Sequence, residues 1–150
     1  MQINDGRHAA IDASMQRIVA AWDAGDASAF AAEFSVDASY VIFAGIVSLG
    51  REEIRAAHVP VFEKWQKGSR MSMRELHRRE AGDSVIVVTE GGIGKGRRIP
   101  HDKVQTFVFV HEGGAWRCAA FQNTKKNVLF IRMNALASDH RSSRTVSPGL

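Results

Sequence analysis

Apolar residues recur at helical spacing along the first third of the chain. One group falls at intervals of three or four residues and predicts a helix from about Ala9 to Ala24: Ile11, Met15, Ile18 and Trp22. Gly25 ends this helix, and Asp26 then stands at an N-cap position. Because Phe30 and Phe34 follow at helical spacing, we expect a short second helix here.

A third helix is predicted from Arg51 to about Gln66, where apolar positions again form one stripe. His58 lies on that stripe, among residues that should face the core. Pro60 removes a backbone donor and clashes with the preceding turn, so the helix should kink near residues 56–60.

Strand patterns follow the helices. Alternating, β-branched or aromatic runs predict strands over 39–43, 71–79, 85–89, 104–110 and 115–124. The last two form a hairpin across the turn at 111–114, which contains Gly113 and Gly114. This order predicts an α+β fold in which three N-terminal helices cover one face of a curved antiparallel sheet.

Alternation along each strand assigns side chains to the two faces of the sheet. It predicts that Glu90, Gln105 and Gln122 point toward the helices, where a buried polar group must find a partner or face a cavity. The opposite face then carries many apolar residues: Val104, Thr106, Val108, Val110, Ala119, Phe121 and Asn123. So much apolar surface predicts a homodimer through the outer sheet face.

Composition indicates one domain with a basic end. Residues 1–124 contain 15 Lys and Arg and 15 Asp and Glu, so the net charge of +4 lies in residues 125–150. A basic groove is therefore not expected, and nucleic acid is an improbable partner. Cys118 is the single cysteine, and neither a signal peptide nor a membrane span is recognisable, so we expect a cytoplasmic protein without a membrane partner.

Several motifs resemble those of a known family. In order they are Ala20–Ala27 (AAWDAGDA), Gly50–Arg55 (GREEIR), Lys67–Arg70 (KGSR), Gln105–Val108 (QTFV) and Ala120–Thr124 (AFQNT). Together they resemble the SgcJ/EcaC group of SnoaL-like proteins, within the nuclear-transport-factor-2-like superfamily. The resemblance covers roughly residues 9–124. It leaves residues 1–8 as an N-terminal arm and 125–150 as a basic extension, whose part from Ser138 to Leu150 is predicted to be disordered.

The resemblance implies a cone-shaped fold that encloses an apolar pocket between sheet and helices, in a protein that is usually dimeric. The superfamily includes ketosteroid isomerase, whose chemistry uses a carboxylate base, a tyrosine and a protonated aspartic acid. The corresponding positions here are Ile42, Ile18 and Gln105, so that chemistry does not carry over. His58 takes a pocket-facing aromatic position of the family.

His58 is the strongest candidate for catalysis, because imidazole can act as acid or base near neutral pH. Its alternative is a core histidine bonded to one carbonyl. Glu90 is the candidate partner of His58, and its alternative is an ion pair with Arg97 or Arg98. Gln105 and Gln122 would orient a ligand oxygen, or pair with one another. The predicted ligand-contacting wall consists of Trp22, Tyr40, Phe62, Trp65 and Phe107.

Other patterns lack the spacing that their chemistry requires. The run from Gly91 to Gly96 is rich in glycine, but it lacks the Walker spacing and a following helix. The six histidines show no metal-ligand spacing, and nothing resembles a nicotinamide or flavin site, so neither metal nor cofactor is predicted. Two functions remain: an isomerase- or cyclase-type enzyme that moves a proton on a small apolar carbonyl compound, or a non-catalytic binding or dimerisation module. An enzyme needs a titratable group inside the cavity.

Overall fold

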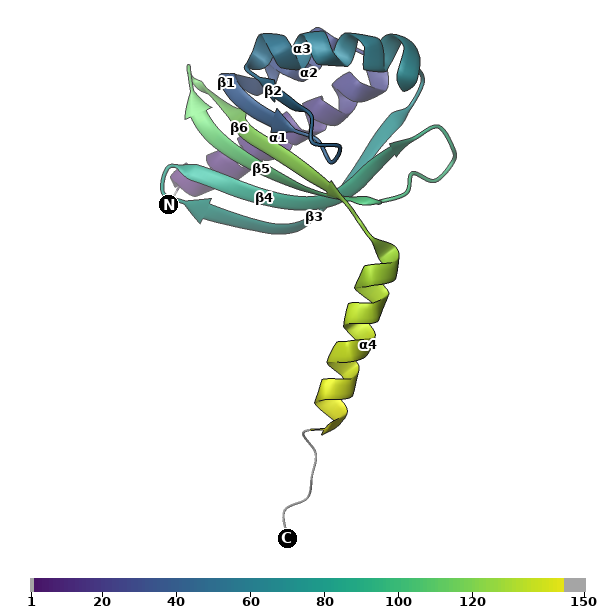
Figure 1. Cartoon of the computed structure of the whole chain (residues 1–150). Helices are drawn as coiled ribbons and strands as arrows, with labels where there is room; N and C mark the ends of the chain where they lie inside the picture. The colour runs from purple at the N-terminus through teal and green to yellow at the C-terminus, as the bar shows by residue number, and fades with distance from the viewer. Residues whose placement is uncertain (1, 145–150) are drawn as a thin grey trace.

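The computed structural model describes the backbone of residues 2–144 and the side chains of residues 6–139 (Figure 1). Its helices are α1 (Gln2–Ala24), α2 (Ala27–Ala32), α3 (Arg51–Pro60), the π-helical turn η1 (Val61–Trp65) and α4 (Val128–Arg144). Its strands are β1 (Phe34–Val41), β2 (Val47–Leu49), β3 (Arg70–Ala81), β4 (Ser84–Gly94), β5 (Lys103–Glu112) and β6 (Ala115–Lys125).

The six strands form one curved sheet in the order β2-β1-β6-β5-β4-β3, and α1, α2 and α3 lie over its concave side (Figure 1). This confirms the predicted α+β fold. Neighbouring strands are antiparallel, except that β1 runs parallel to β6. β2 adds a short edge strand that the sequence pattern did not reveal. Phe34, expected on the second helix, instead begins β1, because α2 ends at Ala32.

Helix α1 begins at Gln2, well before the predicted start near Ala9. Its N-terminal half carries few apolar residues and is held on β3 by charge instead. Asp12 accepts a hydrogen bond of 2.5 Å from Arg78, and His8 lies 3.1 Å from Glu80. These polar contacts between α1 and β3 leave no trace in the spacing of apolar residues, so the sequence predicted a later start for the helix.

The third helix changes its geometry at Pro60, where a kink was predicted. α3 ends at this proline and the chain continues as the π-helical turn η1. The amide of Gln66 donates to the carbonyl of Val61 over 2.7 Å, five residues earlier. Proline has no N–H and crowds the preceding turn. The wider π-helical turn accommodates it, so the chain remains helical beyond the end of α3.

A β-bulge in β6 reverses the predicted faces of its second half. Cys118 pairs with Phe109, but Ala120 pairs with Val108, so Ala119 is an extra residue in the ladder. Beyond Ala119 the inward positions are therefore Phe121 and Asn123. The prediction that these two lie on the outer face is wrong; Ala120, Gln122 and Thr124 lie there instead.

α4 extends away from the domain as a separate helix (Figure 1). Its first turn is capped by the Asn127 side chain, which accepts a hydrogen bond of 3.1 Å from the Phe130 amide. α4 continues to Arg144, and the disorder of residues 138–150 stays a prediction, with residues 145–150 outside the described part. Of the helices between residues 2 and 144, none is long and apolar enough to cross a membrane.

Candidate functional site

A cavity of about 510 Å³ opens between the concave sheet face, α1, the α3–η1 segment and the β1–β2 hairpin. Apolar groups dominate its lining: Trp22, Ile42, Phe43, Ile46, Ala57, Pro60, Val61, Trp65, Met71, Ile93 and Phe121. A small set of polar side chains faces the same space: Tyr40, Ser48, His58, Gln66, Lys103, Gln105 and Asn123. Apolar walls with a few placed polar groups are typical of a small-molecule site.

His58 reaches the cavity from the last turn of α3 and is 5% exposed. Its Nδ1 lies 2.7 Å from the carbonyl oxygen of Ile54, one turn earlier. Since a carbonyl only accepts, Nδ1 carries the proton and Nε2 carries the lone pair in the neutral ring. Aromatic rings surround the imidazole, and the nearest ring centroid is that of Phe30, at 4.3 Å. Nε2 has no hydrogen-bond partner among the described residues.

Burial lowers the pKa of His58 below its usual 6.5, and the hydrogen bond to Ile54 only partly opposes this shift. Water and charge partners that would stabilise an imidazolium are scarce among the surrounding rings. The ring is therefore neutral at pH 7, with an available lone pair on Nε2. A group in this state can accept a hydrogen bond or a proton from a ligand.

Gln105 lies on the inner face of β5, as predicted, and is 4% exposed. Its Oε1 accepts a hydrogen bond of 2.7 Å from the Thr89 hydroxyl on the neighbouring strand. This bond orients the amide, so that its NH₂ group is left to donate into the cavity that Gln105 lines.

Asn123, directly opposite Gln105 in the β5–β6 ladder, is a second amide that the sequence analysis missed. Its Oδ1 accepts a hydrogen bond of 2.7 Å from the Phe43 main-chain amide, so again the NH₂ group remains. Directly paired residues place their Cβ atoms about 5 Å apart, so both amides can reach one ligand oxygen. The bulge at Ala119, which no simple alternation anticipates, brings Asn123 to the inner face.

Glu90 is not in the cavity, and its predicted inward orientation is wrong. Thr89 pairs with Gln105 on the inner face, so Glu90 points to the outer face. There it binds Arg74 and, over 2.7 Å, the Nζ of Lys126. Hydrogen bonds from Lys126 and Arg74 lower the pKa of Glu90 to about 2. The expected His58–Glu90 pair therefore does not form, and neither does the alternative pairing with Arg97 or Arg98.

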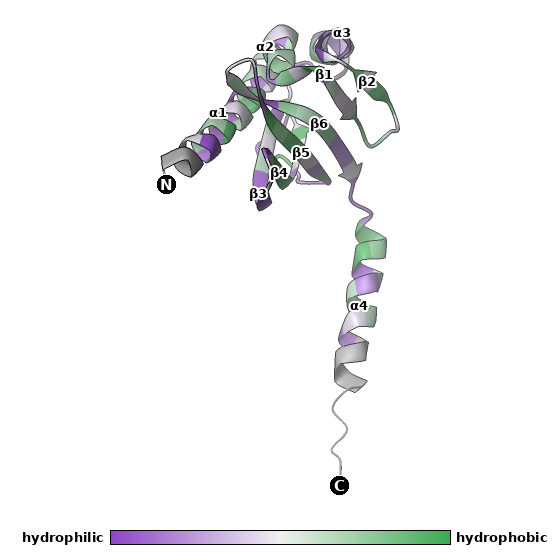
Figure 2. Ribbon diagram, turned by 90° about the vertical axis from the view of Figure 1, so that its left-hand side faces the viewer, coloured by the Kyte–Doolittle hydropathy of each residue, from purple (hydrophilic) through white to green (hydrophobic). Residues whose placement is uncertain are grey.

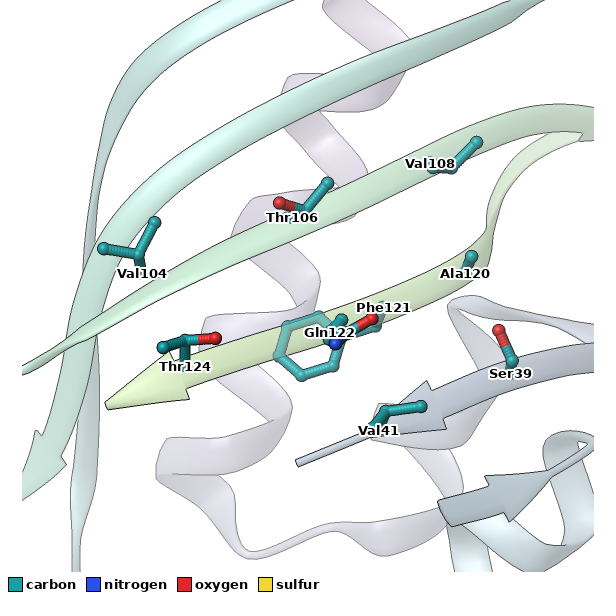
Figure 3. Close-up of a pocket in the computed structure, with 9 residues that line it drawn as sticks. All are labelled: Ser39, Val41, Val104, Thr106, Val108, Ala120, Phe121, Gln122 and Thr124. Carbon is teal, nitrogen blue, oxygen red and sulfur yellow. The ribbon is translucent and has the colours of Figure 1, made fainter. Parts of the chain in front are cut away.

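Gln122 also lies on the outer face, because the bulge reverses its orientation. It lines a separate groove with Val104, Thr106 and other residues of β1, β5 and β6 (Figure 3). Its predicted contact with a ligand in the inner cavity is therefore wrong. Gln105 pairs with Thr89 rather than with Gln122, so the alternative of mutual pairing is wrong as well.

The predicted aromatic wall divides into two layers. Trp22, Tyr40 and Trp65 line the cavity, with Trp65 69% exposed. Phe62 and Phe107 are buried behind it: Phe62 packs edge-on against Trp22, and Phe107 packs against Phe121. Burial raises the pKa of Tyr40 above its ordinary value, so its hydroxyl stays protonated.

Two of the motif stretches meet beside the cavity. The Trp22 indole N–H donates to the Ser69 hydroxyl over 3.0 Å, and the Asp23 carboxylate accepts from the Met71 amide over 2.8 Å. Gly25 follows with a φ of 65°, a conformation that favours glycine, and Asp26 caps α2 by accepting from the Ala29 amide. The motif residues thus hold α1 against the start of β3 at the cavity wall.

Lys103 is the cation among the lining residues that the structure describes, and the sequence analysis did not select it. Its Nζ lies 2.9 Å from Asp102 and 5.2 Å from the centre of the Phe43 ring. No group of three His, Cys, Asp or Glu side chains placed to hold a metal ion occurs among the described residues.

Comparison with known proteins agrees with this architecture. The model of the SnoaL-like domain family matches residues 11–122, which cover most of the fold and the cavity. The chain belongs to the SnoaL-like domain family. The match ends before α4, so this helix lies outside the segment that defines the SnoaL-like domain.

Solved structures resemble this SnoaL-like domain over most of their length. A domain of unknown function with a cystatin-like fold from Nostoc punctiforme is 22% identical, with 93% of this chain and 97% of that chain covered at a TM-score of 0.74. An uncharacterised protein with a cystatin-like fold from Caulobacter vibrioides is 25% identical, with 87% of this chain and 97% of that chain covered at a TM-score of 0.71. An NTF2-like protein from Novosphingobium aromaticivorans is 16% identical, with 84% of this chain and 85% of that chain covered at a TM-score of 0.70. No curated protein matches the chain.

Proposed function

We propose that the cavity binds a small apolar molecule that carries a carbonyl oxygen, and that His58 moves a proton on this molecule. One observation carries the proposal. In a single apolar cavity, His58 offers an unpartnered Nε2 lone pair, while Gln105 and Asn123 offer NH₂ groups whose carbonyl oxygens are already occupied. The site thus combines one base with two donors.

This set of groups suits proton abstraction next to a carbonyl. The ligand oxygen would accept hydrogen bonds from Gln105 and Asn123, while Nε2 of His58 removes a proton from the adjacent carbon. The electron pair of that C–H bond moves onto the oxygen, where the amides stabilise the enolate charge. Where the ligand has a double bond between its β- and γ-carbons, the charge extends to the γ-carbon, and return of the proton from His58 to that carbon completes an isomerisation without any cofactor.

Non-catalytic binding is the second candidate, and the surroundings of His58 favour it. The Nδ1 partner is the neutral carbonyl of Ile54, and the expected carboxylate of Glu90 lies on the other face of the sheet. Without a carboxylate, the imidazolium formed during proton transfer gains less stabilisation. A pure binding protein would use the same amides and apolar walls.

Hydrogen exchange on 2-tetralone, an apolar bicyclic ketone with acidic α-protons, distinguishes the candidates. In D₂O the wild-type protein should accelerate loss of the α-proton NMR signal, His58→Gln should abolish the acceleration, and Glu90→Gln should preserve it. The last variant is a matched control, because Glu90 lies on the outer face. If quenching of tryptophan fluorescence reports binding while exchange stays at the buffer rate, the protein is a binding module.

We further propose that the chain falls within the SgcJ/EcaC group and acts in the cytoplasm. The motif contacts of Trp22, Asp23 and Ser69 around the cavity support the first assignment. The single unpaired thiol, Cys118, which is buried, supports the second.

A further inference from the structure

Helix α4 exposes apolar side chains on every side near its start. Four consecutive residues are each at least half exposed: Val128, Leu129, Phe130 and Ile131. Met133 and Leu136 continue a stripe from Leu129 at 59% and 64% exposure, and Figure 2 shows the start of α4 as hydrophobic. Since successive residues lie 100° apart around a helix, the first turn, residues 128–131, has no polar side. A helix of this kind is normally enclosed by protein.

The domain does not enclose its own α4, and the connection to this helix is short and anchored at the sheet. β6 ends at Lys125 and α4 begins at Val128. Within the two-residue connection, Lys126 donates its main-chain N–H to the Asp102 carbonyl over 2.8 Å, and its Nζ contacts Glu90. These bonds direct α4 away from the sheet, as Figure 1 shows.

The outer sheet face offers an uncharged groove of about 380 Å³, lined by both apolar and small polar side chains, that reaches Thr124 near the end of β6. Nine residues of β1, β5 and β6 line it: Ser39, Val41, Val104, Thr106, Val108, Ala120, Gln122, Thr124 and Phe121 (Figure 3). The ring of Phe121 packs on the inner side of the sheet, against Tyr40 and Phe107. None of the residues that line the groove is charged. α1, α2 and α3 do not cover it, because all three lie on the other face of the sheet.

The groove and the apolar part of α4 match in length. Val104 to Val108 spans about 13 Å along a strand, at about 3.3 Å per residue. Residues 128–136 of α4 extend about 13 Å, at 1.5 Å per residue. The groove can therefore accept the apolar segment of a helix of this length, while the polar end of α4 remains outside it.

We infer that the occupant is α4 of a second copy of this chain, so that two copies exchange their C-terminal helices across a twofold axis. Each copy would contribute its nine groove residues and the nine residues 128–136, close to the roughly 20 residues per side of a standard interface. Near the axis, the first turn would contact the partner's sheet on one side and the partner's helix on the other. A flat lipid surface would cover only one side of the helix.

Cysteine cross-linking in the full chain tests this arrangement. Thr106→Cys, in the groove, and Met133→Cys, on α4, should form an intermolecular disulfide when the two variants are mixed and mildly oxidised. Neither variant alone should cross-link efficiently, because each lacks the partner thiol. Ser28→Cys on α2, on the helical side of the molecule, is the control and should not cross-link with Met133→Cys. Cys118 is buried and should not interfere.

The mass in solution provides a second readout. Light scattering should give a dimer for the wild type, and Leu129→Glu and Val108→Glu should each weaken dimerisation at least tenfold while the circular dichroism spectrum is retained. A monomeric wild type would overturn the inference. So would efficient cross-linking of Met133→Cys with itself and none with Thr106→Cys, which would indicate helix-to-helix pairing. Binding of α4 to phosphatidylcholine–phosphatidylglycerol vesicles, without the mixed disulfide, would overturn it in favour of a lipid surface.

Discussion

Nδ1 of His58 lies 2.7 Å from the carbonyl oxygen of Ile54, so the backbone of α3 itself sets the tautomer of this imidazole in the cavity. The bond leaves the lone pair on Nε2, in a ring that lines a cavity with apolar walls. It also replaces the carboxylate that the sequence predicted as the partner of this histidine. The proposed proton transfer depends on this neutral, oriented ring.

Protonation of His58 should make stability depend on pH. Its folded-state pKa is lowered, so the unfolded chain binds a proton first as the pH falls below about 6.5. The stabilisation is complete above 6.5 and is lost below it, at a rate of at most about 1.4 kcal/mol per pH unit. Urea unfolding between pH 8 and pH 5 should therefore show a shallower decline for His58→Gln than for the wild type. Equal slopes would indicate that the wild-type imidazole is not shielded from protonation.

The two glutamines of the β5–β6 hairpin provide a matched pair of variants. Gln105→Leu removes an inner amide and should weaken 2-tetralone binding about 5- to 10-fold, the equivalent of one hydrogen bond worth about 1 kcal/mol. Gln122→Leu makes the same chemical change in the outer groove and should leave the affinity unchanged. Titration by tryptophan fluorescence measures both. A larger loss for Gln122→Leu than for Gln105→Leu would contradict the assignment of faces.

Gln105 lies on the predicted face of the sheet and Gln122 does not, and this difference shows which features the sequence can predict. Helical periodicity located α1 and α3, and it placed His58 on the buried face, because a helix with one apolar stripe has a single way to pack. Alternation also placed Gln105 correctly. It failed for Gln122, because one extra residue, Ala119, exchanges the two faces of the strand beyond it.

Glu90 was assigned to the wrong face for a different reason. Val85, Ile86, Val87 and Val88 are all apolar, so the strand offers no alternation from which to read its phase. The inner face of β4 carries the polar Thr89, whose hydroxyl donates to Gln105, while the outer face carries Glu90. That partnership joins two strands and is visible only in the folded chain.

The hydrogen bond between Trp22 and Ser69 should contribute measurably to stability. Ser69→Ala leaves the buried indole N–H without an acceptor, which should lower the free energy of unfolding by about 1–2 kcal/mol. Ser28→Ala, the same change at an exposed position of α2, should cost no more than about 0.5 kcal/mol. Urea denaturation at pH 7.5 compares the two variants. Equal costs would show that the indole bond adds nothing specific.

Glu90 should titrate far below an ordinary glutamate. Hydrogen bonds from Lys126 and Arg74 hold its pKa at about 2, against 4.5 without such partners. Its stabilising contribution is therefore present above pH 4.5 and declines as the pH falls toward 2. Carbon-13 NMR of the side-chain carboxyl should show this midpoint, and Lys126→Gln and Arg74→Gln should each raise it. A midpoint near 4.5 in the wild type would mean that neither cation binds Glu90 in solution.

The proposed function requires the inner cavity to bind a carbonyl compound between His58 and the paired amides. A crystal structure of the wild-type protein with 2-tetralone would show this contact. We expect the ketone oxygen within about 3 Å of the Gln105 and Asn123 side-chain nitrogens, with an α-carbon facing Nε2 of His58. A ketone bound in the outer groove, or lying in the cavity with its oxygen turned away from both amides, would contradict it.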